Sequence, residues 1–268
     1  MSVERSNYKM VPDFLNVYCI NLLRRFDRWD YMQTVAKQAG LHLTRVIGVD
    51  AQDPANEDAL NAMIKIGPVG IIGIGARACT ASHTLAWLKF IDSGEAYGVF
   101  LEDDVTLSDD FKIVVNSILA NPPLQDVIKI ECGGSATRGL VLGPKLREHN
   151  GRWMRNCYQL CTDAAGYILS RHGAKTALAR VKHCDVGLDH FLFYPISRHG
   201  GACLPFAIIA PTIVIQDRSM NSDISNTRFE GSQFVRRLRR GSYEAALAPS
   251  MLWHLFNGAK VTTAPFQK

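Results

Sequence analysis

The sequence has no apolar run that approaches the ~20 residues needed to cross a bilayer as a helix. This absence excludes a bilayer-spanning helix. The first residues, MSVERSNYKMVPDF, also lack the apolar segment of a secretory signal. We therefore expect a cytoplasmic protein.

Cysteine is present, but not in the patterns that bind metal or build a disulfide framework. The seven cysteines are scattered and odd in number, and none forms a CxxC pair or a Cys/His zinc spacing. Cys157 and Cys161 are four residues apart and could share one helix face, but a single such pair is a weak indication of a metal site. We expect reduced, mostly buried thiols.

Several nucleotide-binding and catalytic signatures are missing as well. The glycine-rich segment from Ile66 to Ala76 lacks the Gly-Lys-Ser/Thr ending of a P-loop, and GxGxxG is absent. No nucleophile elbow is present, which argues against Ser82 as a nucleophile. There is no internal repeat and no low-complexity linker. With 268 residues, 47% of them hydrophobic, one α/β domain is the simplest account.

The first elements indicated by the sequence are β-α-β. Phe14 to Leu22 is rich in β-branched and aromatic residues, as in a buried strand. Apolar residues recur at helical spacing from Arg25 to Ala39, and Gly40 ends that helix. A second strand follows from Leu41 to Val49, so we expect a parallel sheet with a right-handed crossover.

The spacing of apolar residues also predicts the later elements. We expect a flexible loop over residues 66–76 and a polar loop region from about residue 132 to 155. We expect helices over 57–65, 80–91, 109–119, 171–181 and 189–194, strands over 97–105, 127–131, 164–169 and 207–216, and a peripheral helical tail after residue 231. Pro211 interrupts the last of these strands, which indicates an edge or a bulge.

The most informative segment is Tyr97 to Val105, a short apolar strand that ends in Glu102, Asp103 and Asp104. Three adjacent carboxylates repel one another, and a buried strand end offers little water to weaken the repulsion. A divalent cation such as Mn²⁺ or Mg²⁺, which prefers oxygen ligands, would resolve that conflict. The alternative is an exposed turn, in which Asp is common.

A second polar cluster follows the first strand and contains Asn21, Arg24, Arg25 and Arg28. In open parallel sheets, ligands bind beyond the carboxyl ends of the strands, so this cluster and the acidic one should meet there. Basic groups beside a carboxylate-held cation suit a diphosphate. Taken singly, each arginine is better explained by a solvated helix face.

Two further positions are candidates for chemistry. Ser82 and His83 lie on the helix before the acidic strand and could donate hydrogen bonds to a ligand, although a helix-surface histidine is the simpler interpretation. Asp189 precedes an apolar run and lies four residues after Asp185. Partial desolvation would raise its pKa toward the range of a general base, whereas a helix cap is the alternative role.

The net charge of +5 is modest, and four arginines are concentrated at Arg236, Arg237, Arg239 and Arg240. A solvated helix is the first interpretation of this cluster, and contact with an anionic membrane surface is the second. Nucleic acid is the least favoured partner, because no basic groove with interleaved aromatic residues is evident.

Taken together, the segments from Val17 to Ser225 resemble glycosyltransferase family 25, the lipooligosaccharide-biosynthesis glycosyltransferases related to the collagen galactosyltransferases. Each segment is modest alone, but the order is specific. The segments are VYCINLLRRFDRW, RVIGVDA, CTASHTLAW, YGVFLEDDVTLSDDF, AAGYILSRHGAKTAL, VGLDHFLF and PTIVIQDRSMNSDIS.

The resemblance implies a GT-A-like (Rossmann-like) nucleotide-sugar-binding fold, with a mostly parallel central sheet flanked by helices. It implies a glycosyltransferase domain over residues 14–230, and residues 231–268 are then a basic tail. The implied activity is inverting transfer of a sugar, with galactose as a candidate, from a UDP-sugar. The implied acceptor is a saccharide of lipooligosaccharide or another surface glycan, which can be lipid-linked.

The resemblance also implies roles for individual residues. Glu102 and Asp104 would hold Mn²⁺ (or Mg²⁺) on the donor diphosphate, with Asp103 near the ribose or sugar. The donor would further be bounded by Asn21, Arg24, Arg28, Asp50, Ser82 and His83. Asp50 would lie near the base or ribose, and Asp189 is the best candidate for the catalytic base.

One segment departs from the family pattern. Where the family commonly reads Gly-Glu-Ile-Gly-Cys, this chain has Gly-Ala-Arg-Ala-Cys over residues 75–79. This departure keeps open a catalytically silent nucleotide-sugar- or carbohydrate-binding protein on the same fold. A metal-dependent phosphohydrolase is a weaker alternative, because its additional His and Asp ligands at fixed spacing are not found.

Overall fold

The N-terminal β-α-β unit forms as predicted. In the computed structural model, this unit comprises β1 (Asn16–Asn21), α1 (Phe26–Ala39) and β2 (His42–Ile47). The structure describes residues 16–121, 123–131, 138–195, 201–217, 219–220, 223, 229–230 and 233–268. β1 and β2 are parallel. Gly40 ends α1 with a left-handed φ of 62°, a conformation that glycine adopts without a steric penalty. Residues 14–15 of the predicted first strand lie outside the described residues.

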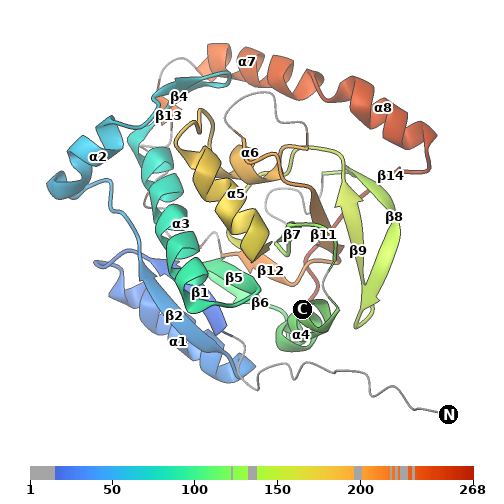
Figure 1. Cartoon of the computed structure of the whole chain (residues 1–268), viewed down its shortest axis with the longest axis horizontal. Helices are drawn as coiled ribbons and strands as arrows, with labels where there is room; N and C mark the ends of the chain where they lie inside the picture. Colours follow the sequence, from blue (N-terminus) through green and yellow to red (C-terminus); the bar gives the residue numbers. More distant parts are fainter. Residues whose placement is uncertain are drawn as a thin grey trace.

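A nine-stranded sheet in the described part of the chain has the order β14-β8-β9-β11-β7-β10-β5-β1-β2 (Figure 1). Its other strands are β5 (Tyr97–Glu102), β7 (Val127–Lys129), β8 (Leu140–His149), β9 (Arg152–Cys157), β10 (Gly166–Ser170), β11 (Phe206–Ala210) and β14 (Lys260–Thr262). β2, β1, β5, β7, β11 and β8 run in one direction, and β10, β9 and β14 run in the other. The predicted α/β class with a mostly parallel central sheet is confirmed.

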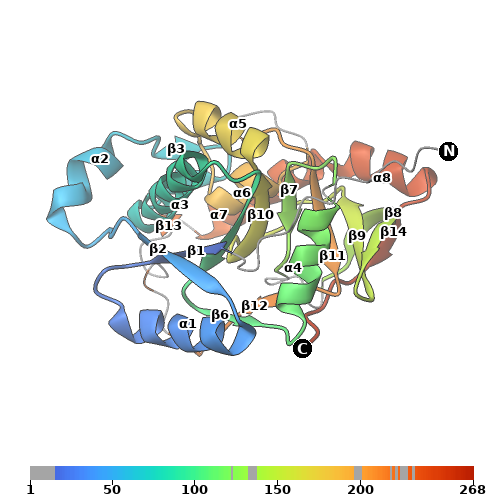
Figure 2. The same cartoon turned by 60° about the horizontal axis from the view of Figure 1, so that its bottom comes forward.

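Helices cover both faces of this sheet (Figure 2). Alternation along β1 sends Tyr18 and Ile20 into one hydrophobic core and Val17 and Cys19 into another. α3 (Ile74–Ser93), α5 (Arg171–Val181) and α6 (Leu188–Phe193) contribute to the first core, and α1 and α4 (Phe111–Ala120) to the second. The central strands are therefore buried on both sides, and functional groups can reach solvent only at the strand ends.

The glycine-rich segment from Ile66 to Ala76 is not the flexible loop that was predicted. It follows η1 (Pro54–Asn56) and the short α2 (Glu57–Asn61). β3 (Ile66–Gly67) and β4 (Gly70–Ile72) form a hairpin, β13 (Phe229–Glu230) pairs with β4, and α3 begins at Ile74 rather than at Thr80. A Cβ added to Gly67 would lie 1.6 Å from the carbonyl oxygen of Asp185, so close backbone packing explains that glycine.

The polar loop predicted up to Arg155 is also wrong, because β8 and β9 form a long antiparallel hairpin there. Its turn contains Asn150 and Gly151, with φ values of 51° and 79°. Consecutive positive φ values at Asn-Gly are typical of a type I′ hairpin turn. The predicted strand over residues 207–216 is divided as expected at Pro211, into β11 and β12 (Val214–Gln216), and β12 pairs with β6 (Val105–Leu107).

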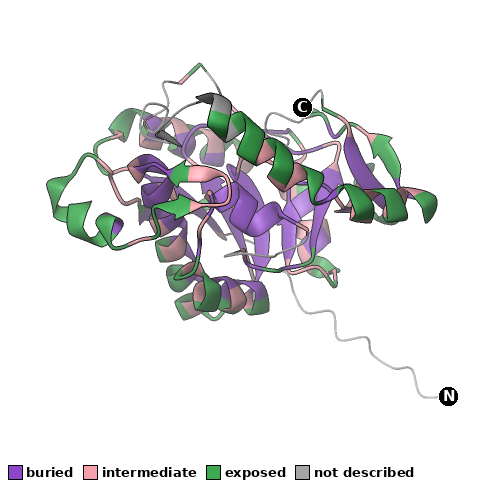
Figure 3. Ribbon diagram, turned by 90° about the horizontal axis from the view of Figure 1, so that it is seen from above, coloured by how far each residue is buried: buried purple, intermediate pink, exposed green. Residues whose placement is uncertain are grey.

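The segment after residue 232 is mostly helical, as predicted. α7 (Gln233–Ala245) and α8 (Ala248–Phe256) lie on the outside of the molecule, where many of their described residues are exposed (Figure 3). β14 then pairs with β8 and forms one edge of the large sheet. None of the described helices combines the length and apolar character needed to traverse a bilayer.

Candidate active site

Predicted site residues gather at the edge of the sheet where β1, β2 and β5 end. β1 ends with Asn21, β5 ends with Glu102, and Asp50 follows β2 by three residues. β10 runs antiparallel, so its first residue, Gly166, lies opposite Leu101 at this same edge. The parallel pairing of β1 with β2 and β5 thus brings together side chains from distant parts of the sequence.

The acidic turn, defined here as Glu102, Asp103 and Asp104, is buried at two of its three positions. Asp103 and Asp104 are 6% and 5% exposed. Asn21 Nδ2 donates to Asp103 Oδ2 at 2.7 Å, and Arg28 Nη1 contacts Asp103 Oδ1 at 2.7 Å and Asp104 Oδ2 at 3.1 Å. One buried guanidinium from α1 therefore neutralises part of the charge of two neighbouring carboxylates.

Glu102 and Asp104 share a second polar partner. Gln216 Nε2 lies 3.2 Å from both carboxylate oxygens of Asp104 and 3.4 Å from Glu102 Oε2. Pairing of β12 with β6 places Gln216 opposite Val105, and the Asp217 N–H donates to the Asp104 carbonyl at 2.7 Å. Burial raises the pKa of Asp104 to about 7, and the nearby Glu102 carboxylate adds to the shift.

These residues fit a divalent cation. Glu102 and Asp104 supply carboxylate oxygens on one side of the turn, whereas Asp103 points to Asn21 and Arg28. One or two carboxylates completed by substrate phosphates are a usual Mg²⁺ or Mn²⁺ environment. A positive charge between Glu102 and Asp104 would also offset the repulsion that raises the pKa of Asp104.

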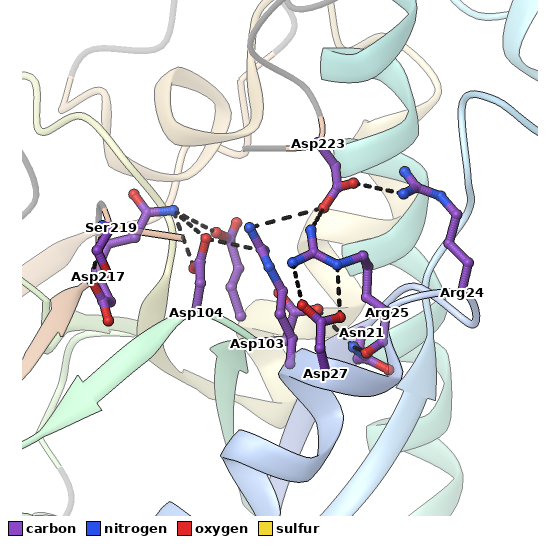
Figure 4. Close-up of polar contacts among 12 residues, drawn as sticks. Asn21, Arg24, Arg25, Asp27, Asp103, Asp104, Asp217, Ser219 and Asp223 are labelled. Atoms are coloured by element: carbon purple, nitrogen blue, oxygen red, sulfur yellow. Dashed lines mark hydrogen bonds and ion pairs between the residues drawn. The ribbon is translucent and has the colours of Figure 1, made fainter. Parts of the chain in front are cut away.

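Asp223 connects the arginines that follow β1 (Figure 4). It accepts from Arg24 Nη1 at 2.8 Å and from Arg25 Nη1, and it lies 3.9 Å from Arg28 Nη2. Arg24 in turn pairs with Asp50 at 2.5 Å. The resulting chain of ion pairs runs from Asp50 to Asp104, so the polar residues after β1, β2 and β5 form one continuous network.

An open cleft of about 620 Å³ lies at the Asp50 end of this network. Leu23, Phe26, Ile47 and Leu85 line it, and these residues are 58%, 59%, 43% and 43% exposed. Exposed apolar residues that cluster in a concave surface are characteristic of a binding site. The remaining lining residues are Arg24, Gly48, Val49, Asp50, Asp53 and Asn56.

The two residues of the Ser-His pair on α3 have different surroundings. Ser82 Oγ donates to the Ala78 carbonyl and accepts from the Val49 N–H, both at 2.8 Å, so it joins α3 to the end of β2. His83 is 1% exposed, and its Nε2 lies 3.5 Å from Glu102 Oε1. Burial lowers the pKa of His83 to about 3, which keeps the ring neutral at pH 7. The predicted surface histidine is therefore a core residue beside the acidic turn.

Asp189 lies in the first turn of α6 and is 9% exposed. The Asp163 N–H donates to Asp189 Oδ2 at 3.2 Å, and the His190 N–H contacts Oδ1 at 2.9 Å. The Asp163 carbonyl accepts from Lys129 Nζ at 2.6 Å, and Lys129 pairs with Glu131 at 2.6 Å with both side chains fully buried. Asp189 is thus held beside a buried ion pair at the end of β7.

Three residues of this site have no role that the sequence predicted. Gln216 and Asp223 belong to the segment PTIVIQDRSMNSDIS, whose family order was noted without a function for either residue. Glu131 is fully buried, and burial raises its pKa to about 7 despite the opposing charge of Lys129. The only feature of the sequence that pointed to Glu131 as a site residue was its position as an acidic residue at the end of a strand. Ser222, Ile224 and Ser225 of the same segment lie outside the described residues.

Acidic and basic side chains meet at the edge of the sheet where β1, β2 and β5 end, which is where open α/β sheets bind their ligands. Residues 14–138 match the sequence model described as glycosyltransferase family 25 (LPS biosynthesis protein). The family predicted from the motifs is confirmed over this segment, which includes β1, α3 and the acidic turn, and the chain is a glycosyltransferase. The later motifs, from residue 164 onward, lie beyond the matched segment.

Comparisons with other proteins add little to this assignment. No curated protein matches the sequence. Among solved structures, the inositol-1-phosphate CTP transferase from T. maritima is similar at a TM-score of 0.40 and 10% identity, over 85% of this chain and 96% of that one. The mannose-1-phosphate geranyltransferase from Thermus thermophilus has a TM-score of 0.32 and 10% identity, over 79% and 76%. At these scores, neither structure contributes to the functional proposal.

The raised pKa of Asp104 predicts a pH-dependent gain in stability when this charge is removed. A carboxyl with a pKa above its unfolded value stabilises the fold fully below pH ~4, and that contribution is lost as the pH rises through about 7. In EDTA, Asp104→Asn should therefore gain stability relative to the wild type between pH 4 and pH 8. The free energy of unfolding of the variant minus that of the wild type should rise by on the order of 2–4 kcal/mol over this range.

Urea unfolding at the two pH values, monitored by tryptophan fluorescence, measures this difference. Asp109→Asn, at an exposed aspartate in the same region, is the control and should give the same difference at both pH values. A pH-independent effect of Asp104→Asn would contradict this account of the turn.

Proposed function

We propose that the protein is an inverting glycosyltransferase with a GT-A-like fold that transfers a sugar, with galactose as the first candidate, from a UDP-sugar to a saccharide acceptor. The acceptor would belong to lipooligosaccharide or another surface glycan. The observation that carries the proposal is the pairing of Glu102 with Asp104 around Gln216 at the end of β5. This pair lies at one end of an ion-pair network whose other end borders the apolar cleft.

The cleft suits the nucleoside part of the donor. Leu23, Phe26 and Leu85 offer apolar surface against which a flat base can pack. Asp50 accepts from Arg24 there and could also accept from a ribose hydroxyl or a base N–H. Ser82 supports this wall indirectly, because its hydroxyl holds the Val49 N–H at the end of β2.

The diphosphate would lie between the cleft and the acidic turn. Glu102 and Asp104 would hold Mn²⁺ (or Mg²⁺), and the cation would neutralise charge on the departing diphosphate. Arg24 and Arg28 flank this position, but both already pair with aspartates. Donor binding would therefore exchange contacts of Asp223 for contacts of the diphosphate, while Asn21 and Arg28 keep Asp103 in position for the ribose or sugar.

Asp189 is the proposed catalytic base. Backbone N–H groups hold both of its oxygens, which fixes the orientation of the carboxylate. The carboxylate would accept the proton of the acceptor hydroxyl as that oxygen bonds to the anomeric carbon. The bond from the anomeric carbon to the diphosphate breaks at the same time, and its electron pair leaves with the nucleoside diphosphate.

A donor screen with Mn²⁺, read out as release of free nucleoside diphosphate, tests the activity. We expect release from one UDP-sugar in the presence of a saccharide acceptor, and loss of release in Asp104→Ala. Asp189→Asn should lower turnover by roughly 10²-fold or more if it removes the base. Asp109→Asn should turn over normally.

Near-normal turnover of Asp189→Asn, together with an inactive Asp104→Ala, would show that the base is a different residue. UDP binding without turnover across all donors would instead favour the catalytically silent alternative. Ala76 and Ala78, which motivate that alternative, are buried in α3 and are not among the residues that line the cleft.

We also propose that the tail contacts the anionic cytoplasmic surface of a membrane, where a lipid-linked acceptor would be presented. Arg237 and Arg239 are exposed on α7, and Trp253 and Phe256 are 61% and 89% exposed on α8. Basic groups beside exposed aromatic side chains are typical of interfacial helices. The side chain of Arg236 lies outside the described part of α7.

Sedimentation with vesicles that contain anionic lipid tests this contact. Replacing Arg236, Arg237, Arg239 and Arg240 by serine should weaken binding at least about tenfold, since each basic residue contributes ~1 kcal/mol near such a surface. The matched control replaces four basic residues outside the tail, which are Lys37, Lys89, Arg147 and Lys175. Equal binding of the tail variant and the wild type would remove the membrane from the proposal.

A further inference from the structure

Three donor atoms of different chemistry converge beside the acidic turn. The Cys79 thiol, a His83 ring nitrogen and a Glu102 carboxylate oxygen all lie within 4.8 Å of one another. Cys79 and His83 are four residues apart on α3, so their side chains project from one face of the helix. Glu102 closes the group from the end of β5.

The His83 ring is held as a metal-binding histidine would be. Its Nδ1 lies 2.8 Å from the Tyr167 hydroxyl, which also accepts from Trp87 Nε1 at 2.8 Å. Its Nε2 is buried without a hydrogen-bond partner among the described residues, and it faces Glu102 Oε1 at 3.5 Å. Ligating histidines usually anchor the second ring nitrogen in this way, which orients the ring and selects the tautomer.

The separation of the donor atoms suits a small tetrahedral ion. Two ligands each ~2.1 Å from a tetrahedral Zn²⁺ lie ~3.4 Å from each other. The observed 3.5 Å between His83 Nε2 and Glu102 Oε1 is close to that edge, whereas it is too long for a strong hydrogen bond. Small side-chain movements would bring the Cys79 sulfur to the same centre.

Glu102 presents its two oxygens to different neighbours. Oε2 contacts Gln216, the shared partner of Asp104, at 3.4 Å, whereas Oε1 faces His83. The thiol and imidazole donors are therefore on a different side of Glu102 from the carboxylate pair assigned to the donor diphosphate. Sulfur and nitrogen donors select Zn²⁺-like ions, whereas carboxylates and phosphates select Mg²⁺ and Mn²⁺.

We propose that Cys79, His83 and Glu102 form a second metal site, which takes a thiophilic divalent cation of the Zn²⁺ type. Cys79 would bind as the thiolate and release its proton to solvent. His83 would bind through Nε2 while its Nδ1–H donates to Tyr167. The bound ion would join α3 to β5 and fix the Glu102 carboxylate next to the donor site, with one coordination position left for water.

Titration of the metal-free full-length protein with Co²⁺ tests this site without reference to activity. We expect one equivalent to bind with a thiolate-to-cobalt charge-transfer band, and Zn²⁺ to abolish the band. Cys79→Ser should lose the band, and His83→Gln should weaken cobalt binding at least about tenfold. Cys161→Ser and Cys203→Ser are the matched controls and should retain it.

The cobalt titration distinguishes failure of this metal site from failure of the proposed transferase function. Asp104→Asn should keep the cobalt band even though it lacks a ligand for the donor diphosphate. Persistence of the band in Cys79→Ser, or no band in the folded wild type, would overturn the proposal. If Cys79→Ser does not fold, His83→Gln decides between the outcomes. Cobalt affinity equal to that of the wild type in His83→Gln would also overturn the proposed metal site.

Discussion

The candidate active site depends on how the negative charges of the three consecutive carboxylates of the acidic turn are compensated at the end of the buried strand β5. Each carboxylate has different partners. Asp103 is held by Asn21 and Arg28, Asp104 by Arg28 and Gln216, and Glu102 lies between Gln216 and His83. Repulsion among the three is reduced by groups from β1, α1 and β12, so the site depends on the packing of these elements against the end of β5.

The negative charge of the acidic turn is only partly compensated by the protein itself. Arg28 supplies a single positive charge to two carboxylates, and burial still raises the pKa of Asp104 to about 7. A buried charge that the protein itself does not fully balance favours binding of a cation. The arginines of the network are likewise paired with Asp50 and Asp223, so an incoming diphosphate meets a preorganised but occupied basic cluster. Under the proposed function, binding of the donor would exchange these ion pairs for contacts with its diphosphate.

The strongest local patterns allowed prediction of the β-α-β start, the position of Gly40 and the burial of the acidic strand. The β8–β9 hairpin was missed although its Asn150-Gly151 turn is a recognised signal, because the flanking residues were read as polar loop. The start of α3 at Ile74 was missed because the glycines over residues 66–76 were taken as a sign of flexibility, although Gly67 is required by close packing against Asp185.

Contacts that join distant parts of the chain could not be read from local patterns. Gln216 reaches Asp104, and Asp223 reaches Arg24, across more than a hundred residues. Cys79 and His83 lie on α3 and Glu102 ends β5, the next element along the chain, so their convergence depends on how that helix packs against the end of the strand. Local spacing identifies the donor types, whereas the packing of helices and strands in the folded chain brings them together.

We propose above all that the acidic turn binds a nucleoside diphosphate through a divalent cation. Calorimetric titration of UDP into the wild-type protein, with Mn²⁺ and with EDTA, tests this most directly. We expect UDP to bind the wild type with Mn²⁺ and to lose affinity at least about tenfold in EDTA, and we expect Asp104→Asn to bind UDP equally weakly under both conditions. UDP binding of equal strength with and without Mn²⁺ would contradict it.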